Sequence, residues 1–324
     1  MKRALSLLGT VLLGVAVLYA SDLSRLAELA AGLRPGWLPA LALTAPALAA
    51  VSVLKWWLLL RARPGGAVPG FTPLLGLYAT GQFYNQVLPS NSGGDVVRAE
   101  MLTRRLRVRG AGGRSAAWAS ITAERFTGLA VLVAMAVPAA LCPAFWAHPL
   151  LMVGIAAGTA LSVAVIAGVL LVPPSPPPPA AGPDRRLLRA LGKARAKLAA
   201  FSADLRSYGR HRRTLAASLA LSAGFYALAV ASVMVAAACF GHPVAVRPAT
   251  LATAAVLVVS LLPVSINGLG LWEASFLASF EALGLGGELG LAVALLLRFR
   301  DLLWAVAGAT VAAACRAGTP ATGA

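Results

Sequence analysis

The stretch Tyr84–Glu100, YNQVLPSNSGGDVVRAE, places a proline, two glycines and several charged side chains inside a strongly hydrophobic chain. Of the 324 residues, 59% are hydrophobic and only 12% are charged, whereas about 25% are charged in an ordinary soluble domain. The mean hydropathy is +0.80, and several apolar runs reach the roughly 20 residues that a helix needs to cross a bilayer. The chain is therefore predicted to be an all-α polytopic membrane protein, and the location of this polar stretch decides its topology.

The apolar runs and the charges between them predict how the chain is threaded. The runs cover approximately residues 4–20, 38–60, 71–88, 116–141, 149–172, 214–240, 249–263, 271–285 and 289–315. We interpret the first run as an uncleaved membrane helix, because many further apolar runs follow it. The net charge is +17, but the lysines and arginines lie between the runs, as the positive-inside rule describes. This distribution argues against nucleic-acid binding and predicts a protein of the cell (cytoplasmic) membrane with both termini in the cytoplasm.

The opening stretch lies between two groups of arginines that both favour the cytoplasm. Arg61 and Arg63 follow the second apolar run, and five arginines between residues 104 and 114 precede the fourth. A single crossing by residues 71–103 would put these two groups on opposite sides. We therefore expect 71–103 to form a re-entrant hairpin that enters and leaves at the cytoplasmic face, with its tip at 88–95.

A second segment in which proline and glycine are expected to break a helix follows in the other half of the chain. We call this segment and the one around 88–95 the broken segments. Residues 261–273 read LLPVSINGLGLWE, and the loops that flank this part of the chain hold few lysines or arginines. These loops are expected outside, so 249–285 is predicted to be a re-entrant hairpin from the external face, with its tip at 262–270. Irregular backbone at membrane depth is tolerated only where protein or a water-filled cavity surrounds it.

The two broken segments resemble each other. Each has Leu-Pro followed by Ser or Asn and then glycines, and Glu100 precedes Arg125 by 25 residues, as Glu273 precedes Arg298. Because the halves are expected to start on opposite sides, they form an inverted-topology repeat of about six full transmembrane helices plus two re-entrant hairpins. Repeats of this kind place a binding site near the membrane midplane, between broken helices.

The predicted repeat also divides the chain into segments. The first repeat covers 1–172, and the second begins near residue 149 and continues through 214–324. Residues 173–213 connect them. Their prolines predict a stiff extended spacer, and the helical spacing of the leucines and basic residues that follow predicts an amphipathic helix on the cytoplasmic leaflet.

Ionisable residues inside membrane segments are costly and rare, so each one is a candidate for function. Arginines near the midplane, helix N-termini and glycine-rich tips with free N–H groups would together bind an anionic headgroup. The candidate substrate-binding residues are Asn91, Gly93, Gly94, Asp95, Arg98, Glu124, Arg125, Asn267, Gly268, Gly270, Glu273 and Arg298. The cysteines and histidines are isolated, so neither a metal site nor a cofactor is predicted.

Some of the same charges are equally compatible with a structural role. Glu100, Arg300 and Asp301 are candidates for structural pairs, with Arg300 and Asp301 near a helix end. The pairs Glu100–Arg125 and Glu273–Arg298 would serve as buried salt bridges as well as ligand contacts, because a buried charge needs a partner in either case. Glu124 and Arg125 are adjacent, so they point about 100° apart on a helix and are poor partners for each other.

Three motifs carry a resemblance to a known family. NQVLPSNSGGDVVRAEML, AERFTGL and LPVSINGLGLWEASF, with Arg298 beyond them, resemble the lysylphosphatidylglycerol synthase transmembrane family, also called flippase-like domain proteins. The resemblance covers nearly the whole chain. It implies an integral membrane domain that moves aminoacylated phospholipid between leaflets, and some relatives accompany glycosylation enzymes. The sequence shows no soluble aminoacyl-transferase domain, so synthesis of lysyl-lipid is not expected.

These observations leave three hypotheses for function. The leading one is a flippase or translocase for an anionic or zwitterionic phospholipid or a polyprenyl-phosphate-linked lipid. The alternatives are an intramembrane lipid-phosphate enzyme, for which no catalytic constellation is visible, and a scaffold partner of a glycosyltransferase. The expected partners are membrane lipids with an anionic headgroup. A homo-oligomer and a lipid-modifying partner enzyme both stay open, and no nucleic-acid partner is expected.

Overall fold

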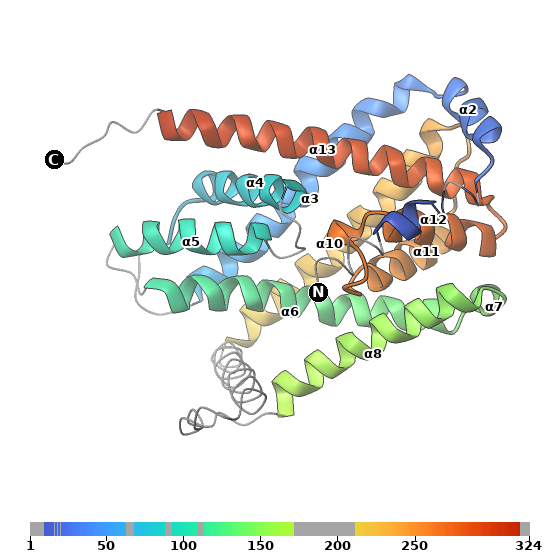
Figure 1. Ribbon diagram of the computed structural model, residues 1–324. Helices are drawn as coiled ribbons and strands as arrows, with labels where there is room; N and C mark the ends of the chain where they lie inside the picture. Colours follow the sequence, from blue (N-terminus) through green and yellow to red (C-terminus); the bar gives the residue numbers. More distant parts are fainter. Residues whose placement is uncertain are drawn as a thin grey trace, which may run out of the picture.

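The computed structural model describes residues 10–15, 17, 19, 21–62, 68–87, 93–108, 113–171 and 211–317. These residues form helices joined by short turns, and no strand occurs among them (Figure 1), which confirms the predicted all-α class. The amphipathic helix expected after the proline-rich spacer, and most of the expected tip at 88–95 including Asn91, lie outside the described residues.

The helices of the described residues follow one another with few long connections. In chain order they are α2 (Leu23–Ala31), the 3-10 turn η1 (Pro35–Trp37), α3 (Leu38–Arg61), α4 (Phe71–Val87), α5 (Gly93–Val108), α6 (Gly113–Ala140), α7 (Pro143–Trp146), α8 (Pro149–Leu171), α10 (Arg212–Cys239), α11 (Val246–Val259), the 3-10 turn η2 (Ile266–Gly268), α12 (Leu271–Ala282) and α13 (Gly287–Ala317).

Length and composition identify the helices that can cross a membrane. Within the described ranges there are four such stretches, at Pro35–Arg61, Ala117–Ala140, Pro149–Gly168 and Arg212–Cys239. The shorter helix α11 is also apolar. The outer faces agree with a lipid environment, because α8 leaves large apolar side chains exposed: Leu150, Val153, Leu161, Val163, Val165, Leu170 and Leu171. Such a continuous apolar surface is rare on a soluble protein, so the chain is a membrane protein.

Two pairs of short helices interrupt this bundle. Helix α4 packs against α5, and α11 packs against α12. In Figure 1 the two pairs lie on opposite sides of the centre. Helix α5 begins at Gly93, so Gly93, Gly94 and Asp95 are helical instead of belonging to an irregular tip. An acidic side chain in the first turn, here Asp95, favours this early helix start because it faces the positive end of the helix dipole.

Glycines allow close helix packing at the first broken segment and a sharp turn at the second. A Cβ added to Gly94 would lie 1.9 Å from the carbonyl oxygen of Gly81, so α4 and α5 meet at backbone distance. In the second segment, Asn267 has φ +52° and Gly270 has φ +78°. This left-handed conformation costs glycine little and is tolerated by asparagine. The chain can therefore leave η2 and enter α12 within a few residues.

The packing partners of the two halves correspond pairwise. The second helix of each hairpin packs on the long helix that follows it, α5 on α6 and α12 on α13. The first helix of each hairpin packs on the long helix of the other half, α4 on α13 and α11 on α6. Helices α3 and α10 pack on each other. The two halves are therefore interlocked rather than set side by side.

Each hairpin also has its own buried apolar cluster. Around α4 and α5 the cluster includes Trp56, Leu74 and Leu102, and around α11 and α12 it includes Phe276 and Phe280. These side chains are almost fully buried. Burial of such large side chains contributes about 1.5–3 kcal/mol each when the alternative is water. The clusters fix the hairpins against the long helices, and this holds the polar residues of the tips in place.

Candidate functional site

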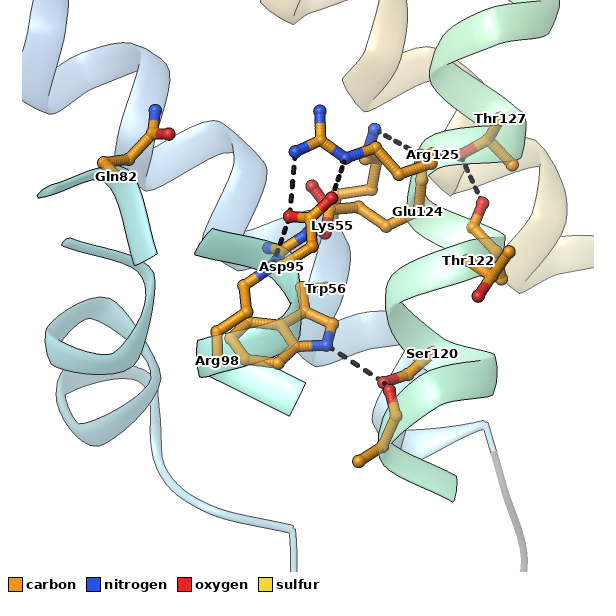
Figure 2. A network of polar contacts seen from close by, with 12 residues as sticks. Lys55, Trp56, Gln82, Asp95, Arg98, Ser120, Thr122, Glu124, Arg125 and Thr127 are labelled. Carbon is orange, nitrogen blue, oxygen red and sulfur yellow. Dashed lines mark hydrogen bonds and ion pairs between the residues drawn. The ribbon is translucent and has the colours of Figure 1, made fainter. Parts of the chain in front are cut away.

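A buried charge cluster lies where α3, α5 and α6 meet (Figure 2). At its centre is Arg98, whose side chain is only 2% exposed. The Arg98 Nε lies 3.0 Å from Asp95 Oδ1, and its Nη2 lies 2.8 Å from Glu124 Oε2. Two carboxylates from different helices thus compensate one buried guanidinium, which a charge in such surroundings requires.

Arg125 approaches the same carboxylate from another side. Its Nε and Nη2 donate to Asp95 Oδ2 and Oδ1 at 3.0 and 2.9 Å, which is a bidentate pair. The Arg125 side chain is 55% exposed, in contrast to the buried Arg98. As expected, the adjacent residues Glu124 and Arg125 do not pair with each other but with Arg98 and Asp95. Asp95 therefore links one buried and one accessible arginine.

Aromatic rings cover Arg98. The guanidinium carbon lies 5.0 Å from the centre of the Trp56 ring and 5.4 Å from that of Tyr78, within the range of a cation–π interaction. Trp56 is held in turn by a hydrogen bond from its Nε1 to Ser120 Oγ at 3.0 Å. The buried Arg98 Nη1 has no hydrogen-bond or ion-pair partner among the described residues. Arg98 thus has the surroundings of a structural residue.

Lys55 completes the cluster, and the sequence analysis did not select it. Its side chain is 7% exposed, and its Nζ donates to the Glu124 carbonyl oxygen at 3.0 Å and to Ser222 Oγ at 3.1 Å. A lysine inside the apolar run 38–60 is the same signal that selected the other intramembrane charges. It was missed because Lys55 belongs to neither broken segment and has no counterpart in the repeat.

The cluster carries an excess of positive charge and opens into a cavity. Three cations (Lys55, Arg98, Arg125) face two carboxylates (Asp95, Glu124), which leaves a formal charge of 3 − 2 = +1 among these described residues. A cavity of about 320 Å³ is lined by Lys55, Glu124, Arg125 and Ser222, together with the aromatic side chains of Tyr78, Phe126, Phe225 and Tyr226. Chemically, such a cavity can accept an anion.

A second, smaller ion pair lies at the other broken segment. Glu273, in the first turn of α12, accepts the N–H of Gly270 on Oε2 at 2.8 Å and the Nε of Arg298 on Oε1. Arg298 comes from the middle of α13, and its side chain is 18% exposed. The predicted pair Glu273–Arg298 is therefore confirmed as a contact. The carboxylate also caps the helix, because it occupies an N–H that would otherwise lack a partner.

The other predicted pair, Glu100–Arg125, is wrong. Arg125 pairs with Asp95, whereas Glu100 is 45% exposed and lies 3.8 Å from Arg104. The reason is the start of α5 at Gly93, which places Asp95 in the first turn. Glu100 comes five residues later, so it points about 140° away around the helix. Asp95, as the third residue of α5, is the structural counterpart of Glu273, the third residue of α12.

Two of the N–H donors expected at the tips are already occupied. The N–H of Gly94 donates to Asn85 Oδ1 at 2.8 Å, and that of Gly270 donates to Glu273. Gly93 is buried at the start of α5, and Gly268 is buried beside Arg298, whose Nη2 lies 3.5 Å from the Gly268 carbonyl oxygen. The amides of Gly94 and Gly270 are therefore not free to bind an anion.

Two further contacts complete the geometry. Asn267 Nδ2 donates to Gln86 Oε1 at 3.1 Å, so the two broken segments touch in the interior. Arg300 pairs with Asp301, with Nη2 and Oδ1 2.7 Å apart, and also donates to Thr44 Oγ1 at 2.7 Å. The expected structural pair Arg300–Asp301 is thus present, although it lies in the middle of α13 rather than near a helix end.

One known family matches most of the sequence. The family model described as "Lysylphosphatidylglycerol synthase TM region" matches residues 4–308. The chain belongs to this family. Both hairpins and both ion pairs lie inside the family region, so the resemblance predicted from the motifs is confirmed. Neither a curated protein nor a solved structure matches the sequence.

Proposed function

We propose that this member of the lysylphosphatidylglycerol synthase TM region family is a lipid flippase or translocase. Its substrate would be an anionic or zwitterionic phospholipid or a polyprenyl-phosphate-linked lipid. The observation that carries the proposal is the cavity of about 320 Å³ with an accessible arginine and a buried lysine in its wall. Such charges inside a membrane protein mark a substrate site more often than a surface feature.

The two cations in the wall of the cavity, Arg125 and Lys55, suit a phosphate. A guanidinium binds phosphate and carboxylate oxygens with the same two-pronged geometry. A phosphodiester can therefore take the place of Asp95 on Arg125, and Asp95 keeps its partner Arg98 when this happens. Lys55 already donates to two uncharged oxygens, so a phosphate oxygen offers its ammonium group a stronger acceptor.

The remaining walls of the cavity suit a lipid rather than a free anion. Beyond the charged residues and several hydroxyl groups, the lining is apolar and includes Leu129, Leu132, Val165 and Leu261. These residues come from α6, α8 and the segment after α11. A headgroup can thus reach the charges while the acyl chains stay against apolar side chains, as the hydrophobic effect favours.

An inverted-topology repeat would explain how such a site faces both leaflets. The pairwise correspondence of packing partners supports it, because α3, α4, α5 and α6 have the same contacts as α10, α11, α12 and α13. Repeats related in this way alternate access by rocking around a central site. In this proposal both termini lie in the cytoplasm, and the re-entrant hairpins enter from opposite faces of the cytoplasmic membrane.

Single cysteines test the proposed topology. In a variant without the native cysteines, new cysteines at Gly70 and Arg105, before and after the first hairpin, are expected to react only from the cytoplasm. Cysteines at Ala245, before the second hairpin, and at Glu281, near its end, are expected to react with a membrane-impermeant maleimide from outside. All four positions are exposed. Labelling of Gly70 and Arg105 from different sides would contradict a re-entrant first hairpin.

Reconstitution tests the proposed function. Purified protein in liposomes is expected to carry a fluorescent phosphatidylglycerol from the inner to the outer leaflet, where dithionite quenches it, faster than in protein-free vesicles. Thin-layer chromatography of the same lipid should show it chemically unchanged. A changed lipid would favour the enzyme hypothesis, and a flipping rate equal to that of empty vesicles for every lipid class would exclude transport.

A further inference from the structure

The buried Lys55 differs from the two arginines of the charge cluster in its partners. Arg98 and Arg125 each pair with a carboxylate. None of the ion pairs found among the described residues includes Lys55. Its Nζ donates instead to two uncharged oxygens, the Glu124 carbonyl oxygen and Ser222 Oγ. Because a charge removed from water needs an opposite charge nearby, an ammonium group at this position lacks the partner that an incoming anion would supply.

The hydrogen bonds of Lys55 lead to the same conclusion. An ammonium group has three N–H donors, whereas a neutral amine has two and a lone pair. The protein offers Lys55 Nζ two acceptors among the described residues, at 3.0 and 3.1 Å. These satisfy both donors of an amine and leave the third donor of an ammonium group to the cavity that Lys55 lines. One further acceptor, such as an oxygen of a bound phosphate, completes the ammonium group.

Among the three cations of the cluster, Lys55 is the one that can release its proton, because a guanidinium group stays charged. The other charged and titratable residues around it are Tyr78 of α4, Asp95 and Arg98 of α5, Glu124 and Arg125 of α6 and Tyr226 of α10. Both carboxylates already have arginine partners. Helix α13 also packs on α3, but its Arg300 contacts Thr44, 11 residues before Lys55. This separation is about 16 Å along the helix.

Buried hydroxyl groups surround Lys55 on the side of α10. Ser222 Oγ donates to the Ser218 carbonyl oxygen at 2.9 Å, and Ser218 Oγ lies 3.0 Å from Thr127 Oγ1. Thr127 Oγ1 lies 3.1 Å from the same Glu124 carbonyl oxygen that Lys55 contacts. All three hydroxyl-bearing residues are almost fully buried. Because a hydroxyl group both donates and accepts, these surroundings suit Lys55 with and without its extra proton.

The charge of the whole cluster depends on the state of Lys55. With Lys55 as an amine, the two arginines and the two carboxylates balance. With Lys55 as an ammonium group, the cluster has one positive charge in excess, which one phosphate monoanion cancels. If the proton and the phosphate bind together, the site is neutral both before and after binding. A neutral site avoids the cost of moving a net charge through the membrane.

We propose that Lys55 couples lipid transport to protons. Its amine takes up one proton from water when a phosphate binds beside Arg125, and a hydrogen bond forms between Nζ and a phosphate oxygen. When the phosphate leaves on the other side of the membrane, Lys55 returns the proton to the water there. The protein thus carries one proton with each anionic lipid, and a pH gradient drives the lipid towards the alkaline side. The inference rests on the proposed transport function and adds the force that drives it.

A pH gradient across liposomes tests this coupling. The membrane potential is held at zero with potassium and valinomycin, and dithionite reports the share of a fluorescent phosphatidylglycerol in the outer leaflet. With wild-type protein, a gradient of about one pH unit is expected to shift the steady-state distribution roughly tenfold towards the alkaline side. Protein-free vesicles under the same gradient give the background. An even distribution despite rapid exchange would overturn the coupling and leave transport standing. Wild-type protein that exchanges no lipid at any pH would overturn both proposals.

Two variants locate the proton. Lys55→Arg keeps the positive charge but holds its proton permanently, so exchange is expected to be slower and to end in an even distribution under the same gradient. Tyr226→Phe is the matched control, because it removes another ionisable group from the wall of the same cavity. This control should keep the tenfold shift. A shift that persists in Lys55→Arg, or disappears in Tyr226→Phe, would show that another group carries the proton.

A binding measurement covers the case in which Lys55→Arg transports no lipid. Short-chain phosphatidylglycerol is added to the protein in weakly buffered detergent solution that contains a pH indicator. Wild-type protein is expected to take up about one proton for each lipid bound, and the lipid should bind more tightly as the pH falls, because the two equilibria are linked. Lys55→Arg is expected to bind the lipid without proton uptake. Binding to the wild type without proton uptake would contradict the inference.

Discussion

Replacing Arg125 with alanine is expected to lower lipid translocation in liposomes by roughly 10- to 100-fold, with little loss of stability. Arg125 is the most accessible arginine of the charge cluster, with 55% of its side chain exposed, and it lines the cavity. Its removal takes away two charge-assisted donors for a phosphate. The fold tolerates the change because Asp95 keeps its ion pair with Arg98. The leaflet-exchange rate of a fluorescent phosphatidylglycerol, measured beside thermal unfolding in detergent, checks both parts.

Two further variants separate charge from geometry. Arg125→Lys keeps the positive charge but loses the planar fork, so an intermediate rate is expected. Arg104→Ala removes an arginine whose side chain is 80% exposed and forms an ion pair with the partly exposed Glu100. Transport by the Arg104 variant should equal that of the wild type. A wild-type rate for Arg125→Ala would show that the cavity does not bind the headgroup.

Replacing Arg98 with methionine is expected to destabilise the protein by about 3–5 kcal/mol. Arg98 is 2% exposed and pairs with both Asp95 and Glu124. Without it, Glu124 loses its ion pair in the interior, and Asp95 keeps only the accessible Arg125. The expected result is a much lower unfolding temperature in detergent and poor accumulation in the membrane. Activity is lost as a consequence of unfolding, in contrast to the Arg125 variant.

A double variant tells this structural role from a direct role in binding. Combining Arg98→Met with Glu124→Gln removes the unpaired charge along with its partner, so part of the lost stability should return. Such recovery follows the general rule that a whole buried ion pair is easier to replace than one of its members. Unchanged stability of the Arg98 single variant would contradict the structural role. A double variant less stable than the single one would show that Glu124 has other essential contacts.

The broad class of the protein, and where its helices are broken, could be predicted from the sequence. The Pro- and Gly-containing runs near Pro89 and Pro263 predict breaks, because proline lacks an N–H and glycine lacks a Cβ. Helix α4 indeed ends at Val87 and α11 at Val259. The pair Glu273–Arg298 followed from its spacing in the repeat. The pair Glu100–Arg125 does not form, although its spacing is the same. Helix α5 starts earlier than expected, and Asp95 in its first turn takes the place of Glu100 as the partner of Arg125.

Contacts between distant parts of the chain could not be predicted in the same way. Lys55 hydrogen-bonds to Ser222, which is 167 residues away, and no local pattern links the two. Tyr78, Gln82 and Gln86 are four residues apart, so the sequence places them on one face of α4. The residues of α13 that lie opposite this face are known only from the packing. The spacing of residues thus indicates which face of a helix is polar. Which residues pack against that face can be known only from the folded structure.

The interlocked packing of the two halves also has a consequence for biogenesis. Helix α4 has its long partner in α13, which is synthesised much later. The first hairpin, with Asp95 and Arg98 in its second helix, therefore emerges from the ribosome long before its permanent neighbour exists. Until then, its polar groups need another protected environment in the bilayer, such as the interior of the insertion machinery.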